Sequence, residues 1–160
     1  MEDIKRLLAC VDLSDFSKTT LEHAILLSKR LEAELIVLHV LNVRDIEAVR
    51  MASEYFPEVV NMENYIEDKK RQRYHQVDAM IHNDFPEEHQ NMKILVQIGN
   101  PVEEILDAIQ SENIDLVVMA NKGKSNLTRT FFGSIAEKIF RHSPVPVISI
   151  RKRTQSFRRT

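Results

Sequence analysis

The chain has 160 residues, of which 43% are hydrophobic and 29% are charged, and its formal net charge is -2 at pH 7. This length suits one domain with a full hydrophobic core, and the composition excludes an intrinsically disordered chain. The charge creates no global field that would attract nucleic acid or a membrane surface. No apolar run approaches the roughly 18 residues that a membrane span requires. We therefore expect no membrane and no specific nucleic acid among its partners.

The first apolar run begins directly after a charged start, Met1 to Arg6, and is too short for the core of a signal peptide. The single cysteine, Cys10, lies inside this run and has no second cysteine with which to form a disulfide. We interpret it as a buried, inert thiol. These features predict a cytoplasmic protein.

Five short runs of continuous hydrophobic residues predict strands that are buried on both faces. In chain order they are Leu7–Val11, Leu35–Val40, Ile94–Ile98, Leu116–Met119 and Val145–Ile150.

Helical spacing of apolar residues appears between these runs. The first helix is predicted around Leu21 to Leu31, with both of these residues on its inward face. A later helix opens with Asn100 as the N-cap and Pro101 in the first turn. The last helix starts near Ser134. Its inward residues are expected to be Ile135, Ile139 and Phe140.

A long connection, residues 44–90, separates the second and third strands. We expect a helical piece that ends near Tyr55, a break at Pro57 and a further helix that carries Val77 and Ile81. The domain is assigned to residues 1–151. Residues 152–160 form a basic tail, which is predicted to be solvated and disordered.

Alternating strands and helices indicate the α/β class, with right-handed crossovers and a parallel sheet. The expected architecture is a single Rossmann-like, doubly wound, five-stranded parallel sheet with helices on both faces. Ligands bind such sheets in the crevice where the winding direction reverses, beyond the carboxyl ends of the strands. With the first strand central, the loops that start at Asp12 and at Ala120 face this crevice.

The loop after the fourth strand is framed by two of the chain's three glycines, Gly123 and Gly133. Gly133 and Ser134 open the final helix, where free backbone N–H groups attract anions. Lys122 adds a cation. The alternative is that Gly133 only makes a turn and Ser134 only caps the helix.

The segment that begins at Ala120 and reaches Gly123, followed by nine residues and then Gly133-Ser134, resembles the nucleotide motif of the universal stress protein family, G-x2-G-x9-G-[S/T]. The first strand with Asp12, the pair His39-Val40 and the closing helix and strand are also similar to that family. The resemblance covers nearly the whole chain except the long connection and the basic tail.

The resemblance implies the strand order 3-2-1-4-5, a homodimer through Val145–Ile150, and ATP or AMP as the ligand. Asp12 would contact the ribose, and Val40 would contact the adenine through its backbone. The phosphates would lie against Gly123, Gly133 and Ser134. The full nucleotide site is assigned to Asp12, Val40, Ala120, Lys122, Gly123, Gly133, Ser134 and Ile135. Ala120 departs from the motif, because its methyl group stands where the family has its first glycine.

Other nucleotide folds fit less well. Gly123-Lys124-Ser125 is similar to the end of a P-loop, but the required earlier glycine position is Val118, inside a strand. A dinucleotide-binding fold would need glycines after the first strand, where Asp12 and its neighbours stand.

Metal and acid–base chemistry find little support in the sequence. His75, His82 and His89 recur every seven residues, but Pro86 is expected to end their helix before the third. Asp12 and Asp15 are the candidates for holding Mg²⁺ together with a nucleotide.

No set of nucleophile, base and orienting residue can be named, so we predict a regulatory adenine-nucleotide-binding stress-response protein rather than an enzyme, with slow ATP hydrolysis left open. It would signal to protein partners that the sequence does not identify. The alternative is a nucleotide-free dimeric interaction module of the same fold.

Overall fold

A computed structural model of the protein describes residues 3–122 and 133–151. Its five strands form one parallel sheet in the order β3-β2-β1-β4-β5, as the sequence predicted. The strands are β1 (Arg6–Cys10), β2 (Glu34–Asn42), β3 (Met92–Gly99), β4 (Leu116–Ala120) and β5 (Val147–Ile150).

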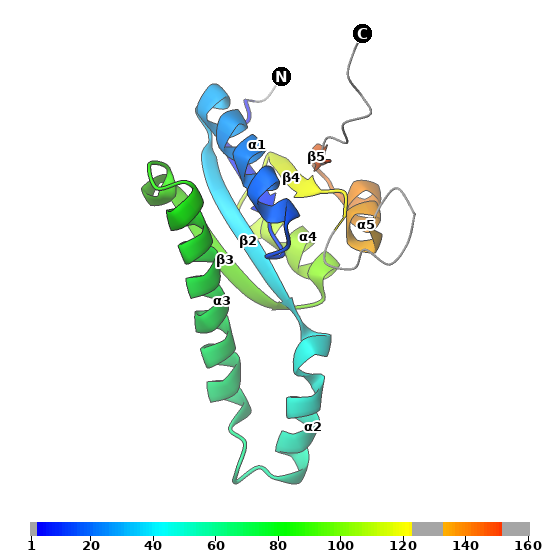
Figure 1. Ribbon diagram of the computed structural model, residues 1–160. Coiled ribbons are helices and arrows are strands. Elements are labelled where there is room, and N and C mark those ends of the chain that lie inside the picture. Colours follow the sequence, from blue (N-terminus) through cyan, green and yellow to red (C-terminus); the bar gives the residue numbers. More distant parts are fainter. Residues whose placement is uncertain (1–2, 123–132, 152–160) are drawn as a thin grey trace.

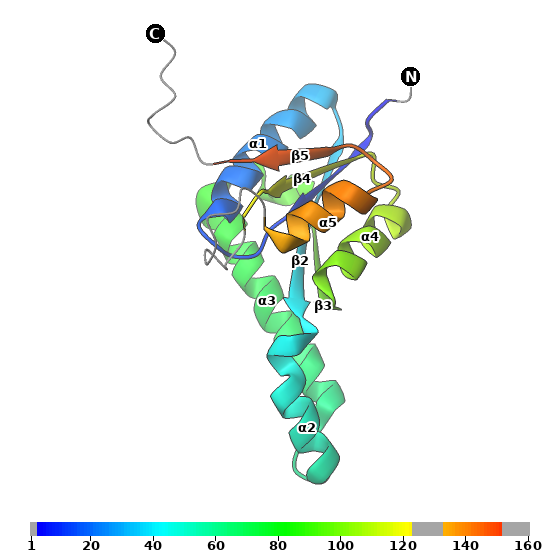
Figure 2. The same cartoon turned by 90° about the vertical axis from the view of Figure 1, so that its right-hand side faces the viewer.

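Helices cover both faces of the sheet (Figures 1 and 2). Helices α1 and α3 pack on one face, and α4 and α5 pack on the other. Among the described residues, no helix is long and apolar enough to cross a membrane. The helices are α1 (Phe16–Leu31), α2 (Glu47–Tyr55), α3 (Met62–Asp84), α4 (Pro101–Ser111) and α5 (Ser134–His142), with short 3-10 turns η1 (Val43–Ile46) and η2 (His89–Asn91).

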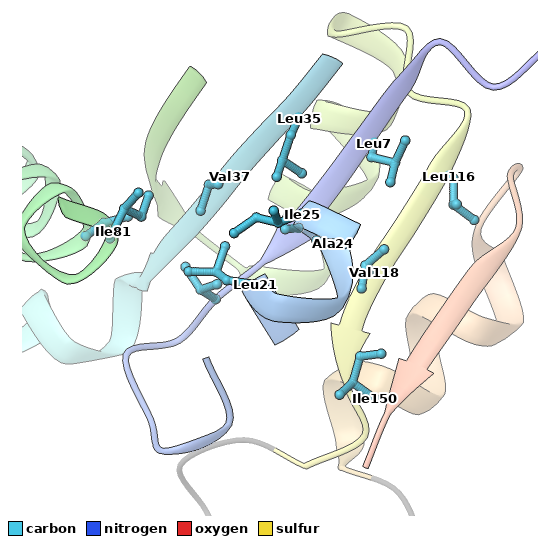
Figure 3. Close-up of a cluster of buried hydrophobic side chains, with 13 residues drawn as sticks. Leu7, Leu21, Ala24, Ile25, Leu35, Val37, Ile81, Leu116, Val118 and Ile150 are labelled. Carbon is cyan, nitrogen blue, oxygen red and sulfur yellow. The ribbon is translucent and has the colours of Figure 1, made fainter. Parts of the chain in front are cut away.

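The core between the sheet and α1 is built from alternate residues of neighbouring strands (Figure 3). Leu7 of β1 and Val37 of β2 point toward Leu21 and Ala24 of α1, and all four are fully buried. Burial of each leucine stabilises the fold by about 1.5–3 kcal/mol. This packing fixes α1 across the central strand, and its N-terminus therefore lies beside the carboxyl end of β1.

Helix α1 begins earlier than its apolar spacing indicated, at Phe16. Its first turns bury Ser17 and Thr20, and the Thr20 hydroxyl donates to the Phe16 carbonyl oxygen at 2.9 Å. Polar residues on the inward face hid these turns from the hydrophobic pattern. At the other end, Leu31 is 40% exposed, so its predicted inward position was wrong.

The predicted inward face of α5 was wrong in two positions. Ala136 and Ile139 are buried, whereas Ile135 and Phe140 are exposed. Ala136 and Ile139 are three residues apart and therefore share the helix face that packs on the sheet. Ile135 and Phe140 each lie one residue outside this pair, and one residue turns the helix by about 100°, away from the sheet. The N-cap of α4 was predicted correctly, because the Asn100 side chain accepts from the N–H of Val102 at 3.0 Å.

The fifth strand starts at Val147, later than the apolar run from Val145 indicated. Ser143 occupies both backbone groups of Val145, since its hydroxyl donates to the Val145 carbonyl at 2.7 Å and accepts from the Val145 N–H at 3.2 Å. These local bonds form a turn in place of ladder pairing.

The long connection forms a helical hairpin, α2 and α3, that projects beyond the sheet (Figures 1 and 2). The chain leaves α2 at Tyr55, passes Pro57 and starts α3 at Met62. The returning half of α3 packs on the sheet through Val77 and Ile81, both fully buried. One end of α3 is therefore held rigidly over β2 and β3.

Strand β5 forms an edge of the sheet, and its backbone alternates between β4 and the open side. The Pro146 carbonyl accepts from the N–H of Val117 in β4 at 3.0 Å. The Ile150 carbonyl accepts from the N–H of Asn121, directly after β4, also at 3.0 Å. In a strand, neighbouring residues direct their backbone groups to opposite sides. The N–H groups of Val147 and Ser149 therefore point to the open edge, whereas that of Ile148 faces β4. An apolar edge of this kind favours pairing with a second copy.

We expect light scattering of the full chain at micromolar concentration to give twice the 18.6 kDa chain mass. Ser149→Pro removes an outward donor and should give a folded monomer. Ile148→Pro is the matched control, because it removes a donor that faces β4 and should lower stability instead. A monomeric unmodified chain would contradict pairing through β5.

Candidate functional site

A cavity of about 430 Å³ opens at the carboxyl end of the sheet, where β1 lies between β2 and β4. The chain winds from β1 toward β3 in one direction and then crosses to β4 and β5 in the other. The cavity thus occupies the position where the winding reverses, which is the expected ligand position in this class of fold.

Most of the residues that the sequence assigned to a nucleotide site line this cavity. Gly123 lies outside the described residues. The assigned residues found in the lining are Asp12, Val40, Ala120, Lys122, Gly133, Ser134 and Ile135.

Asp12 organises the loop that joins β1 to α1. One of its carboxylate oxygens accepts from the Ser14 N–H at 3.0 Å and from the Ser17 hydroxyl at 3.3 Å. Leu13, which lies between Asp12 and Ser14, has a φ of 61°, a left-handed conformation that is uncommon for residues other than glycine. The loop holds this strained turn, and the turn keeps the Asp12 carboxylate at the cavity wall.

Asp15, the second candidate for holding Mg²⁺, does not belong to the cavity lining. It precedes α1 and makes no capping hydrogen bond through its side chain. Among the described residues, no group of three or more His, Cys, Asp or Glu side chains is arranged to hold a metal ion.

His39 ties the ends of β1 and β2 together beneath the cavity. Its buried ring lies with Nδ1 2.9 Å from the Val11 carbonyl oxygen, and since a carbonyl only accepts, Nδ1 carries the proton. The Val11 N–H also donates to the Leu38 carbonyl at 2.9 Å. These two bonds fix the backbone of Val40 relative to the loop of Asp12.

The start of α5 forms the opposite wall. The Gly133 N–H donates to the Asn121 carbonyl at 2.6 Å, and the Asn121 N–H donates to the Ile150 carbonyl at 3.0 Å. These bonds anchor the helix N-terminus at the end of β4. Gly133 is the N-cap and has no side chain to accept from the first helical amides, which have no acceptor inside the helix. Such a terminus is suited to an anion.

Several lining residues were not found by the sequence analysis. Ser17 and Thr20 come from the inward face of α1, Asn42 and Asp45 come from the end of β2 and the turn after it, and Arg73 comes from the middle of α3. None belongs to a motif, and no periodic pattern marks them. A polar residue on the inward face of a helix, as at Thr20, was the one available signal.

Cys10 lies on the cavity floor and packs against the apolar cluster below it. Burial raises the pKa of its thiol to about 12. The sulfur is therefore protonated at neutral pH and is not a nucleophile.

The fold and this cavity define a doubly wound α/β domain with a ligand site at its switch point. The model of the universal stress protein family matches residues 3–151. The chain belongs to this family.

Individual relatives agree with this assignment. A universal stress protein of Methanocaldococcus jannaschii is 24% identical over 155 residues, which cover 93% of this chain and 96% of the relative. The structure of the universal stress protein UspA from Lactobacillus plantarum is similar, with a TM-score of 0.63, 26% identity and coverage of 94% of this chain and all of that chain. A universal stress protein from Archaeoglobus fulgidus in complex with dAMP shares the fold, with a TM-score of 0.54, 17% identity and the same two coverages.

The position of Cys10 predicts slow chemical labelling of the folded protein. Moving a thiol pKa from 9.0 to about 12 lowers the thiolate fraction at pH 8 about a thousandfold. Labelling of the folded protein with iodoacetamide, followed by intact mass, should therefore be about a thousandfold slower than labelling of the protein unfolded in urea. The rate for the folded protein should rise tenfold per pH unit up to about pH 11. Similar rates for folded and unfolded protein would contradict the raised pKa of this half-buried thiol.

Proposed function

We propose that the protein binds an adenine nucleotide, ATP or AMP, in the switch-point cavity and acts as a regulatory stress-response domain rather than as an enzyme. The observation that carries this proposal is the meeting of the Asp12 loop and the uncapped N-terminus of α5 across one cavity of about 430 Å³. The size suits a small-molecule ligand. The dAMP complex of the Archaeoglobus fulgidus relative supports the class of ligand.

The phosphates would lie at the start of α5. The first amides of the helix and the exposed Ser134 hydroxyl supply donors, and Lys122 supplies a positive charge at the end of β4. A phosphate at this position also interacts favourably with the positive end of the helix dipole.

The nucleoside would lie over β1 and β2. The Asp12 carboxylate, held by Ser14 and Ser17, can accept from ribose hydroxyl groups. The backbone of Val40, positioned through His39, would face the adenine. This arrangement places the two halves of the ligand on opposite sides of the central strand.

Mg²⁺ would enter the site on the phosphates of the nucleotide. Mg²⁺ usually retains water and takes only one or two carboxylates from the protein. Asp12 is the assigned carboxylate that lines the cavity, whereas Asp15 lies outside the lining. The residues present therefore fit a metal that is brought by the nucleotide.

A regulatory role is supported by the side chains of the described cavity. The imidazole of His39 is buried and bonded to the backbone of Val11. The thiol of Cys10 is held protonated by its raised pKa. Neither is poised to activate water, so ATP hydrolysis should be slow. We further propose a cytoplasmic location, which suits a single cysteine without a disulfide partner, and signalling to partner proteins through a β5-paired homodimer.

The competing function is a nucleotide-free dimeric interaction module, and Ala120 is the observation that favours it. This residue lines the cavity where the family motif has a glycine, so its methyl group occupies space beside a bound ligand.

Calorimetry with ATP–Mg²⁺ and with AMP tests the proposal. A nucleotide at about 100 times its dissociation constant adds roughly 2.7 kcal/mol to the free energy of unfolding, which should raise the melting temperature by about 5–10 °C. The ATP should remain intact over hours when followed by chromatography. Absence of heat and of a thermal shift at millimolar nucleotide would favour the nucleotide-free module.

Gly133→Val tests the position of the phosphates. The backbone at Gly133 has φ -69° and ψ 151°, which valine adopts readily, so the fold should persist. The added side chain should shield the first amides of α5 and weaken ATP binding at least tenfold, or about 1.4 kcal/mol. Phe140→Val, an exposed neutral change in the same helix outside the cavity lining, is the control. Unchanged affinity in folded Gly133→Val protein would place the phosphates elsewhere.

A further inference from the structure

The long connection contributes a cation to the cavity. Arg73 and Asp45 are the described lining residues that come from the segment 44–90, and Arg73 reaches the cavity from α3. The family motifs lie outside this segment. The contact therefore comes from the connection between β2 and β3 and lies outside the motifs.

The direction of Arg73 is set by the packing of α3. Val77 and Ile81, four and eight residues later, are fully buried against the sheet. Residues four apart share a helix face, so Arg73 lies on the face that α3 presents to the sheet, one turn beyond the core. Arg71, two residues earlier, faces away, since its side chain is 65% exposed and pairs with Asp68 at 3.2 Å.

The guanidinium of Arg73 is only partly satisfied. Its Nη1 donates to the Gln76 side-chain oxygen at 2.9 Å. Its Nε is buried and has no hydrogen-bond partner among the described residues. A buried donor without an acceptor is unfavourable, and a small rotation of the guanidinium toward a ligand acceptor would relieve it.

The place of Arg73 in the cavity indicates which half of a ligand it meets. The wall that suits phosphate is at the end of β4 and the start of α5, on one side of β1. Asn42 and Asp45, the polar lining residues after β2, lie on the other side of β1, and α3 packs over β2 and β3. The carboxylate of Asp45 would also repel a phosphate there.

We propose that Arg73 binds the nucleoside half of the ligand, by donating a hydrogen bond to a ring nitrogen of the purine or to a ribose oxygen. This inference rests on the proposed nucleotide binding and adds a side-chain contact that the motifs do not contain. It makes α3 part of the binding site. The projecting hairpin is thereby joined directly to the ligand.

Calorimetric titration of ATP, AMP and adenosine into the full-length protein tests this assignment. A hydrogen bond from a charged donor predicts that Arg73→Gln weakens binding of all three ligands by a similar factor, about tenfold or more. Arg71→Gln has the same charge change on the same helix, but its side chain faces solvent, so affinities should stay within about twofold. Thermal unfolding without ligand verifies that each variant is folded.

Three outcomes would overturn the assignment. Equal affinities of Arg73→Gln and the unmodified protein would show that Arg73 makes no contact. A loss confined to ATP and AMP, with adenosine unaffected, would make Arg73 a phosphate-attracting cation. If Arg73→Gln does not fold, Arg73→Met replaces it, because methionine keeps an unbranched side chain and has no hydrogen-bond donor, and full affinity for adenosine in that variant would also overturn the assignment. Failure of the unmodified protein to bind any nucleotide would overturn the proposed function itself.

Discussion

The pairing of β1 with both β2 and β4 is the constraint on which the remaining structure depends. Leu8, fully buried at the centre of β1, pairs with Ile36 on one side and Val117 on the other. From this central strand the chain crosses first to β2 and β3 on one side and later to β4 and β5 on the other. The loops at the carboxyl ends of the strands therefore separate above β1, and the crevice opens there. The cavity is therefore a consequence of the strand order. Its walls are the loops that this order brings together, at Asp12 and Gly133.

The cavity combines a rigid base with locally unfavourable features at its rim. Beneath it, the bond between His39 and Val11 ties two strands together. Beside the lining residue Asp12, Leu13 adopts a left-handed conformation, and at the opposite wall the N-cap Gly133 provides no side-chain acceptor. The Nε of Arg73 is buried without an acceptor in the part of the chain that the structure describes. Such features weaken the ligand-free fold slightly and are tolerated where the surrounding structure holds them in place. Their concentration around one cavity agrees with a binding role.

The α2–α3 hairpin projects beyond the sheet (Figures 1 and 2). Its tip carries exposed apolar side chains, including Tyr55, Phe56 and Val59, far from the core. The other end of α3 is fixed by Val77, and Arg73 lies between the two. A ligand contact at Arg73 would restrain the helix close to its anchored end. Ligand occupancy would then be linked to an element that extends well past the sheet (Figure 2).

The amino-acid sequence by itself determined the five strands, because continuous hydrophobic runs are local signals, and the resemblance to the family predicted their order. It also indicated residues such as Asp12 and Gly133, which line the cavity, while their role in binding a nucleotide stays a prediction. Tertiary structure decided the rest. It buried Thr20 and exposed Phe140, since a helix face is defined by what packs against it rather than by apolar spacing alone. It also brought Arg73 to a cavity built around Asp12 and Gly133. That placement depends on how α3 packs on the sheet, and no local pattern encodes a contact between elements so distant in the chain.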